Sequence, residues 1–192
     1  MQKSFFKGFT VAALTAMMGF SAGAFAEQPA ALATCAACHG ESGQSANPQW
    51  ANLGGQHEGY LAIQLRNFRS GERKNDVMNG IAAGLSDSDI DELAAWYSAQ
   101  PHVTAANGKA DMVEQGQNRA AYCHGCHGMK GHPVADEWPV LAGQNASYLA
   151  KQLNGFKTGA RYHPLMAPVV KDLDRAAMMA LGSYYSQVPT ED

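Results

Sequence analysis

Two stretches of the chain decide its fold: Cys35-Ala36-Ala37-Cys38-His39 and Cys123-His124-Gly125-Cys126-His127. The sequence around the first motif recurs around the second at one constant offset, without insertion or deletion, over most of each half of the chain. The matched positions include Trp50 and Trp138, Gln56 and Gln144, Tyr60 and Tyr148, Phe68 and Phe156, Arg73 and Arg161, and Tyr97 and Tyr185. The repeat predicts two similar domains in tandem, each of about 80 residues and with a thin apolar core.

Both motifs have the pattern of covalent c-type haem attachment. Two cysteines separated by two residues reach one porphyrin edge from a single helical turn, and the adjacent histidine then lies below the ring as an iron ligand. We therefore predict two covalently attached haem c groups and a protein that moves electrons. The residues assigned to this role are Cys35, Cys38 and the proximal ligand His39, and Cys123, Cys126 and the proximal ligand His127.

Three other uses of the cysteines are weighed against haem. Disulfides suit an exported chain but give no reason for a histidine after each pair. A Cys-x-x-Cys redox pair needs no such histidine either. A zinc site needs four ligands close together, and these two pairs are far apart in the sequence.

The repeat also supplies a candidate for the opposite iron position in each domain. Met78 follows His39 at the same separation at which Met166 follows His127. A methionine is more often a core residue than a ligand, but the matched spacing favours Met78 and Met166 as axial ligands. None of the other histidines recurs at the repeat offset, although His163 is close to Met166.

The segment 1–26 is expected to be a cleaved signal peptide. Lys3 and Lys7 precede an apolar stretch, and Ala24-Phe25-Ala26 is a small-x-small cleavage site. The alternative is a retained membrane anchor, for which the apolar run is short. Residues 27–101 then form the first domain, 102–109 a linker and 110–192 the second domain.

The apolar periodicity predicts helices and no strands. Tyr60, Leu61, Gln64, Leu65 and Phe68 share one helical face, and Gly71 follows as a stop. The second copy runs from Tyr148 to Phe156 and stops at Gly159. Ser86 and Asp174 are expected to cap the last helix of each domain, and a further helix over about 110–121 leads into the second motif.

The composition excludes a nucleic-acid binder. The chain carries a net charge of −3 and lacks the basic stripe that such proteins present. Residues 27–101 hold four Lys and Arg against nine Asp and Glu, whereas residues 102–192 hold eight of each. This uneven charge either orients the protein toward a charged partner or only aids its solubility.

The combined motifs resemble the bacterial cytochromes c4, a dihaem branch of the class I c-type cytochromes. The resemblance rests on the two attachment motifs followed by glycine, on Leu53-Gly54-Gly55-Gln56 and Leu141-Ala142-Gly143-Gln144, and on the two Tyr-Ser endings. It implies an all-α fold of two class I cytochrome c domains related by a pseudo-two-fold axis, with the haems facing each other across the interface. It also implies a periplasmic carrier between redox proteins such as a cytochrome bc-type complex and a terminal oxidase or periplasmic reductase. Some members associate loosely with the membrane.

Two positions depart from the family pattern. A proline carbonyl usually accepts the ring N–H of the proximal histidine; Pro139 fits that role, but the first domain has Ala51. Gly116 allows the helix before the second motif to pack tightly on the last helix, whereas the matching residue is Gln28. We therefore expect the helix pair of the first domain to be looser or truncated.

Two other functions remain open. One is an enzyme, such as a dihaem peroxidase or a thiosulfate-oxidising cytochrome; a peroxidase needs an open iron, and the latter often has unusual axial ligation. The symmetric methionines argue against both. The other is an electron-transfer subunit bound permanently to a larger reductase, which the sequence does not distinguish from a free shuttle.

Overall fold

The computed structural model describes residues 28–190, where helices are the only regular secondary structure. The predicted signal peptide lies outside these residues. None of the described helices is long and apolar enough to cross a membrane. In chain order the helices are α1 (Leu32–His39), α2 (Glu58–Ser70), α3 (Asp76–Ala82), α4 (Asp87–Ser98), the 3₁₀ helix η1 (Ala110–Met112), α5 (Val113–His127), the 3₁₀ helix η2 (Met129–Gly131), α6 (Ala146–Thr158), α7 (Met166–Val170) and α8 (Arg175–Gln187).

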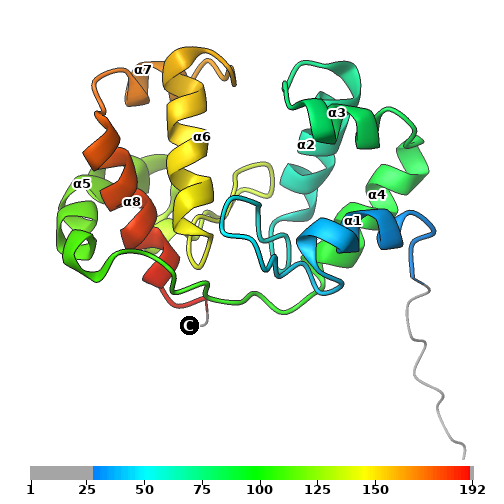
Figure 1. Cartoon of the computed structure of the whole chain (residues 1–192), viewed down its shortest axis with the longest axis horizontal. Coiled ribbons are helices and arrows are strands. Elements are labelled where there is room, and N and C mark those ends of the chain that lie inside the picture. The colour runs from blue at the N-terminus through cyan, green and yellow to red at the C-terminus, as the bar shows by residue number, and fades with distance from the viewer. Residues whose placement is uncertain (1–27, 191–192) are drawn as a thin grey trace, which may run out of the picture.

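The helices form two sets that lie side by side (Figure 1). Helices α1–α4 make one set and α5–α8 the other, and residues 101–109, which contain no helix, connect them. Helices α2 and α6 face each other in the middle of the molecule, with α1 and α4 on one outer side and α5 and α8 on the other. This is the predicted all-α arrangement of two tandem units.

The helix ends follow from the residues that flank them. Gly71 and Gly159 take left-handed conformations, with φ of 79° and 78°, and end α2 and α6 as predicted. The Ser86 side chain accepts from the backbone N–H of Asp89, whose carboxylate accepts from the Ser86 N–H in a capping box. Asp174 caps α8 by accepting from the Ala177 N–H.

The two units have matching cores. In the first, Leu61, Ile90, Leu93 and Tyr97 pack α2 against α4. In the second, a corresponding set from α6 and α8 is extended by Ala120 on α5: Leu149, Leu181, Tyr185 and Ala120. The loops repeat as well, since the Gly55 N–H donates to Tyr97 O at 3.0 Å and the matching Gly143 N–H donates to Tyr185 O at 2.8 Å.

The first unit has the shorter leading helix. Helix α1 is 8 residues long, whereas α5 is 15. Helix α5 crosses α8 at Gly116, where an added Cβ would lie 2.0 Å from the Ala180 carbonyl oxygen. The matching Gln28 is exposed and precedes α1. The expectation of a truncated first helix pair is therefore confirmed.

Two glutamines join the units in a reciprocal way. The Gln56 side chain donates to Val140 O at 3.0 Å and accepts from the Val140 N–H at 2.8 Å. Gln144, which matches Gln56 in the repeat, donates to Asn52 O at 2.8 Å and accepts from the Asn52 N–H at 2.7 Å. Asn52 and Val140 are themselves matched positions, so these contacts obey a pseudo-two-fold axis.

Replacing Gln56 or Gln144 by alanine is expected to weaken the attachment of the two units. Each change leaves a buried backbone N–H and C=O of the other unit without a partner, and such groups cost about 1–3 kcal/mol each. We expect the free energy of unfolding of the holoprotein, measured by chemical denaturation, to fall by about 2 kcal/mol or more for either variant. The exposed Gln49 is the control, because it lies at the surface; a Gln49→Ala loss of the same size would contradict the assignment.

One inter-unit contact has no symmetric counterpart. The Asp136 carboxylate accepts from the Gly59 N–H at 2.6 Å, and its carbonyl accepts from the Tyr60 N–H at 2.9 Å. Helix α2 has no side-chain cap from its own N-cap residue, His57, so the other unit supplies one. The residue that matches Asp136 is Pro48, which has no carboxylate.

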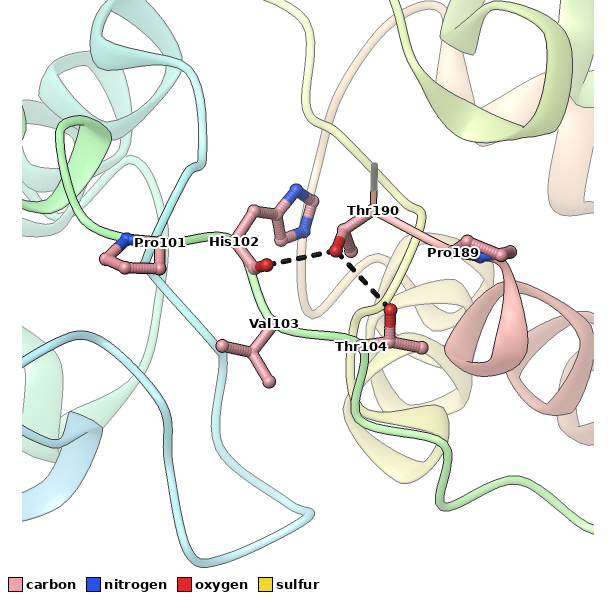
Figure 2. A pocket seen from close by; sticks show the side chains of 6 residues that line it. All are labelled: Pro101, His102, Val103, Thr104, Pro189 and Thr190. Carbon is pink, nitrogen blue, oxygen red and sulfur yellow. Dashed lines mark hydrogen bonds between the residues drawn. The ribbon is translucent and has the colours of Figure 1, made fainter. Parts of the chain in front are cut away.

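The connecting segment and the end of the chain enclose a small surface pocket (Figure 2). The Thr190 hydroxyl donates to His102 O at 3.0 Å and lies 3.4 Å from the Thr104 hydroxyl. These bonds tie the segment between the units to the residues after α8. None of the predicted haem residues lines this pocket.

Candidate haem centres

Each attachment motif lies at the C-terminal end of a helix. Cys35, Cys38 and His39 are on the last turns of α1. The matching residues of the second motif, Cys123, Cys126 and His127, end α5. The positive-φ glycines Gly40 and Gly128 follow at once and turn the chain away from the helix, so each histidine is the last helical residue.

The two predicted proximal histidines are oriented in the same way. His39 Nδ1 lies 2.8 Å from Ala51 O, and His127 Nδ1 lies 3.2 Å from Pro139 O. Because a carbonyl oxygen only accepts, Nδ1 carries the proton and Nε2 keeps its lone pair. The carbonyl expected at Pro139 thus performs its role, and the alanine of the first unit supplies the same acceptor. Orientation of a metal-binding histidine by a backbone carbonyl is a common arrangement.

Burial also keeps these imidazoles neutral. It lowers the pKa of both His39 and His127, and the carbonyl acceptors Ala51 and Pro139 only partly oppose it. The neutral ring is the form that binds a metal ion. Burial likewise raises the pKa of the Cys35 and Cys123 thiols.

The four cysteines are free, so the structure forms no disulfide between them. Within residues 28–190 no three His, Cys, Asp or Glu side chains come together as a zinc site requires. The donor set that each motif does present, two thiols and one imidazole nitrogen on consecutive turns of a helix, suits thioether attachment with one protein ligand below the ring.

The two methionines lie on matching short helices. Met78 is in α3, where the Asn75 side chain accepts from its backbone N–H, and Met166 is the first residue of α7. Both methionines are half-buried. Beside them, Val77, Leu165 and Val169 are 66%, 58% and 48% exposed. Apolar side chains of this kind next to each methionine fit contact with a large flat apolar group such as a porphyrin.

The aromatic repeat residues differ between the units. Trp138 lies beside His127, with the two ring centroids 6.2 Å apart, whereas Trp50 is 40% exposed. The Tyr60 and Tyr148 hydroxyls accept from arginines of the opposite unit. Arg73 is only 9% exposed.

Two of the remaining histidines, His57 and His132, make side-chain hydrogen bonds. His57 Nδ1 donates to Trp138 O at 2.9 Å across the interface, and His132 Nε2 lies 3.1 Å from Pro189 O. His163, the closest in sequence to Met166, is exposed, and its carbonyl accepts from the Met166 N–H. These contacts assign His57 and His132 to local hydrogen bonding and leave His163 at the surface.

Sequence reasoning assigned no role to the residues that join the units. Gln56, Gln144 and Asp136 all bond across the interface. The recurrence of Gly-Gln at the repeat offset was the available signal for the glutamines. Asp136 gave no signal, because its position does not repeat.

Comparison with known proteins agrees with this architecture. The family model described as Cytochrome c matches residues 26–98. The thiosulfate dehydrogenase electron acceptor of Stutzerimonas stutzeri is 37% identical over 175 residues, which cover 83% of this chain and 81% of that protein. Cytochrome c4 of Pseudomonas aeruginosa is 32% identical over 181 residues, which cover 87% of this chain and 90% of that protein.

A solved structure extends the likeness to three dimensions. Reduced recombinant cytochrome c4 from Pseudomonas stutzeri matches with a TM-score of 0.74 and 32% identity, over 82% of this chain and 95% of that one. The likeness thus spans both units, each of which carries an attachment motif and an oriented histidine. The chain belongs to the cytochrome c4 family of dihaem electron-transfer proteins, with two class I cytochrome c domains that each bind a covalent haem c.

Proposed function

We propose that this protein is a periplasmic electron carrier in which both haem irons have histidine–methionine ligation. His39 and Met78 hold the first iron, and His127 and Met166 hold the second. Cys35, Cys38, Cys123 and Cys126 form the thioethers. The observation that supports this most is the matched orientation of the two histidines by Ala51 O and Pro139 O, with a methionine at the same separation after each.

This ligation favours carriage of electrons over catalysis. The thioether is a soft, neutral ligand that favours ferrous iron and raises the reduction potential. With both axial positions filled, a substrate has no open site on the metal. The chain's own contribution is to hold each imidazole with its Nε2 toward the iron and to keep it neutral by burial.

The proposed partners are respiratory redox proteins. A cytochrome bc-type complex is the proposed donor, and a terminal oxidase or periplasmic reductase the proposed acceptor. The relatives include a thiosulfate dehydrogenase electron acceptor, which favours a second candidate donor, a thiosulfate dehydrogenase. A loose association of this protein with the membrane is compatible with a cytochrome bc-type complex as donor and a terminal oxidase or periplasmic reductase as acceptor.

An optical redox titration of the purified holoprotein, repeated under carbon monoxide, tests the carrier proposal. Two haems at positive potentials with no carbon monoxide binding are the expected result. A haem at low potential, or one that binds carbon monoxide readily, would overturn the ligation and favour an enzyme. Reduction of the holoprotein by a bc-type complex and by a thiosulfate dehydrogenase, compared in stopped-flow mixing, ranks the two donors.

The location has a separate test. Periplasmic extraction followed by N-terminal sequencing is expected to recover a haem-bearing chain that begins at Glu27. Recovery only with membranes, with residues 1–26 still attached, would support the retained anchor instead. Copurification with a larger reductase after detergent extraction would indicate a bound subunit.

A further inference from the structure

Two arginines meet at the interface between the domains. Arg73 follows α2, and Arg161 follows α6 at the matching position of the repeat. Each guanidinium stacks on a phenylalanine of its own domain, with Cζ 4.4 Å from the ring centroid of Phe68 or Phe156. We call the set around them the arginine cluster; its members are Arg73, Arg161, Gln64, Gln152, Tyr60 and Tyr148.

Every arginine in the cluster bonds to both domains. Arg73 donates to Gln64 Oε1 at 2.7 Å in its own domain, and to Gln152 Oε1 at 2.8 Å and the Tyr148 hydroxyl at 3.0 Å in the other. Arg161 repeats the pattern with Gln152 at 2.8 Å, Gln64 at 2.9 Å and Tyr60 at 3.0 Å. Each glutamine oxygen therefore accepts from both guanidinium groups.

The cluster carries positive charge that the described chain does not balance. Arg73 is 9% exposed, and among residues 28–190 no carboxylate lies within ion-pair distance of Arg73 or Arg161. A glutamine oxygen shared by two cations does not neutralise either of them. Desolvating an unpaired charge is costly, and two like charges in one site add to that cost.

The cluster also holds more hydrogen-bond donors than acceptors. Both tyrosine oxygens accept from an arginine, which leaves their own O–H groups free to donate. The Gln64 and Gln152 amide groups make no hydrogen bond within the described residues. Burial alone raises the pKa of Tyr60, yet the charges of Arg161 and Arg73 outweigh it and lower that pKa. A partly buried site with two cations and free O–H and N–H donors has the chemistry that binds carboxylates.

The cluster is attached to the segments that carry the proposed axial methionines. The Asn79 side chain, next to Met78, donates to Arg73 O at 2.9 Å. Arg161 lies five residues before Met166, as Arg73 does before Met78. A haem c carries two carboxylates on one edge, and both domains bind a haem. The haem carboxylates are therefore the candidate anions for this cluster.

We propose that the arginine cluster binds haem carboxylates of both domains and that each arginine sets the reduction potentials of both haems. Because each guanidinium bonds to residues of both domains, its charge acts on the two irons together. A nearby cation disfavours the ferric state, so it raises the potential. This inference requires the two haems but depends neither on the axial methionines nor on the partners proposed above.

The test is a redox titration of holoprotein variants with the two haems resolved by NMR. Arg73→Gln is expected to lower the ferrous-to-ferric ratio at fixed applied potential by about fivefold at both haems, and Arg161→Gln should do the same. Redox-difference infrared spectra should show shifted carboxylate bands in both variants. Arg73→Lys and Arg161→Lys should largely restore the ratios, because they keep the charge.

Arg66→Gln is the matched control, since Arg66 lies on α2, is only half-buried and pairs with Asp91 at 2.6 Å. Arg66→Gln should change the ferrous-to-ferric ratio of each haem by less than twofold. A shift at only one haem, or unchanged carboxylate bands, would overturn the proposal. A bound free anion predicts instead that the wild-type potentials follow phosphate concentration at constant ionic strength, and that result would also overturn it.

Discussion

Holoprotein with Met166→Ala is expected to bind carbon monoxide at its second haem and to have a lower potential there. Loss of the thioether opens one iron position and removes the ligand that favours ferrous iron. Axial ligands set haem potentials over a range of roughly 0.8 V, so we expect a fall of about 0.1 V or more. Met78→Ala should do the same at the first haem only. Optical titration with and without carbon monoxide measures both effects.

Two further variants make this result decisive. Met129→Ala is the control, because Met129 lies next to the second motif but is 74% exposed and has no match in the repeat; it should change neither property. His163 is three residues before Met166 and is the nearest other metal-binding side chain in the sequence. Met166→Ala with His163→Ala removes both side chains. If this double variant still excludes carbon monoxide, Met166 is not the ligand.

Gly116→Ala is expected to destabilise the second domain by about 3 kcal/mol or more, the upper end of the range for overpacked sites. The added Cβ would lie 2.0 Å from Ala180 O, 2.6 Å from the Ala180 carbonyl carbon and 2.7 Å from the Tyr184 Cβ. The two Ala180 atoms belong to the backbone and cannot rotate away as a side chain does, so α5 must move from α8. Denaturation of the holoprotein, followed by circular dichroism, measures the loss.

Gly84→Ala is the corresponding control, since a Cβ there meets nothing within 4 Å. We expect it to stay within about 0.5 kcal/mol of the wild type. The first domain carries Gln28 at the position that matches Gly116 and avoids the clash by having a shorter helix. A Gly116→Ala protein as stable as Gly84→Ala would mean that the two helices do not approach so closely.

The local structure was predictable because it depends on residues close in sequence. Gly71 and Gly159 end helices because glycine adopts positive φ at little cost. Ser86 and Asp174 cap helices through the backbone three residues ahead. The role of the Ala51 carbonyl oxygen as acceptor was also predictable. Every residue has a backbone carbonyl, and Ala51 occupies the position that matches Pro139 in the repeat.

The contacts between the domains were not predictable in the same way. Gln56 and Gln144 each bond a backbone position in the other half of the chain, and nothing near them in sequence identifies that partner. Arg73 follows an exposed, polar stretch, and the contacts with Tyr148 and Gln152 of the opposite domain form only in the folded pair. The metal ligands themselves remain predictions from spacing, supported by the orientation of His39 and His127.

The unmatched contact at Asp136 makes the two halves of the molecule complementary rather than interchangeable. The N-terminus of helix α2 is capped by the Asp136 carboxylate of the second domain. The matching residue of the first domain is Pro48, which cannot cap helix α6 in this way. A chain built from two copies of the first domain would keep the reciprocal glutamine at Gln56 but would have no acidic cap for either helix. Duplication alone therefore does not account for this pair, because only the second copy carries this carboxylate and only the first one uses it.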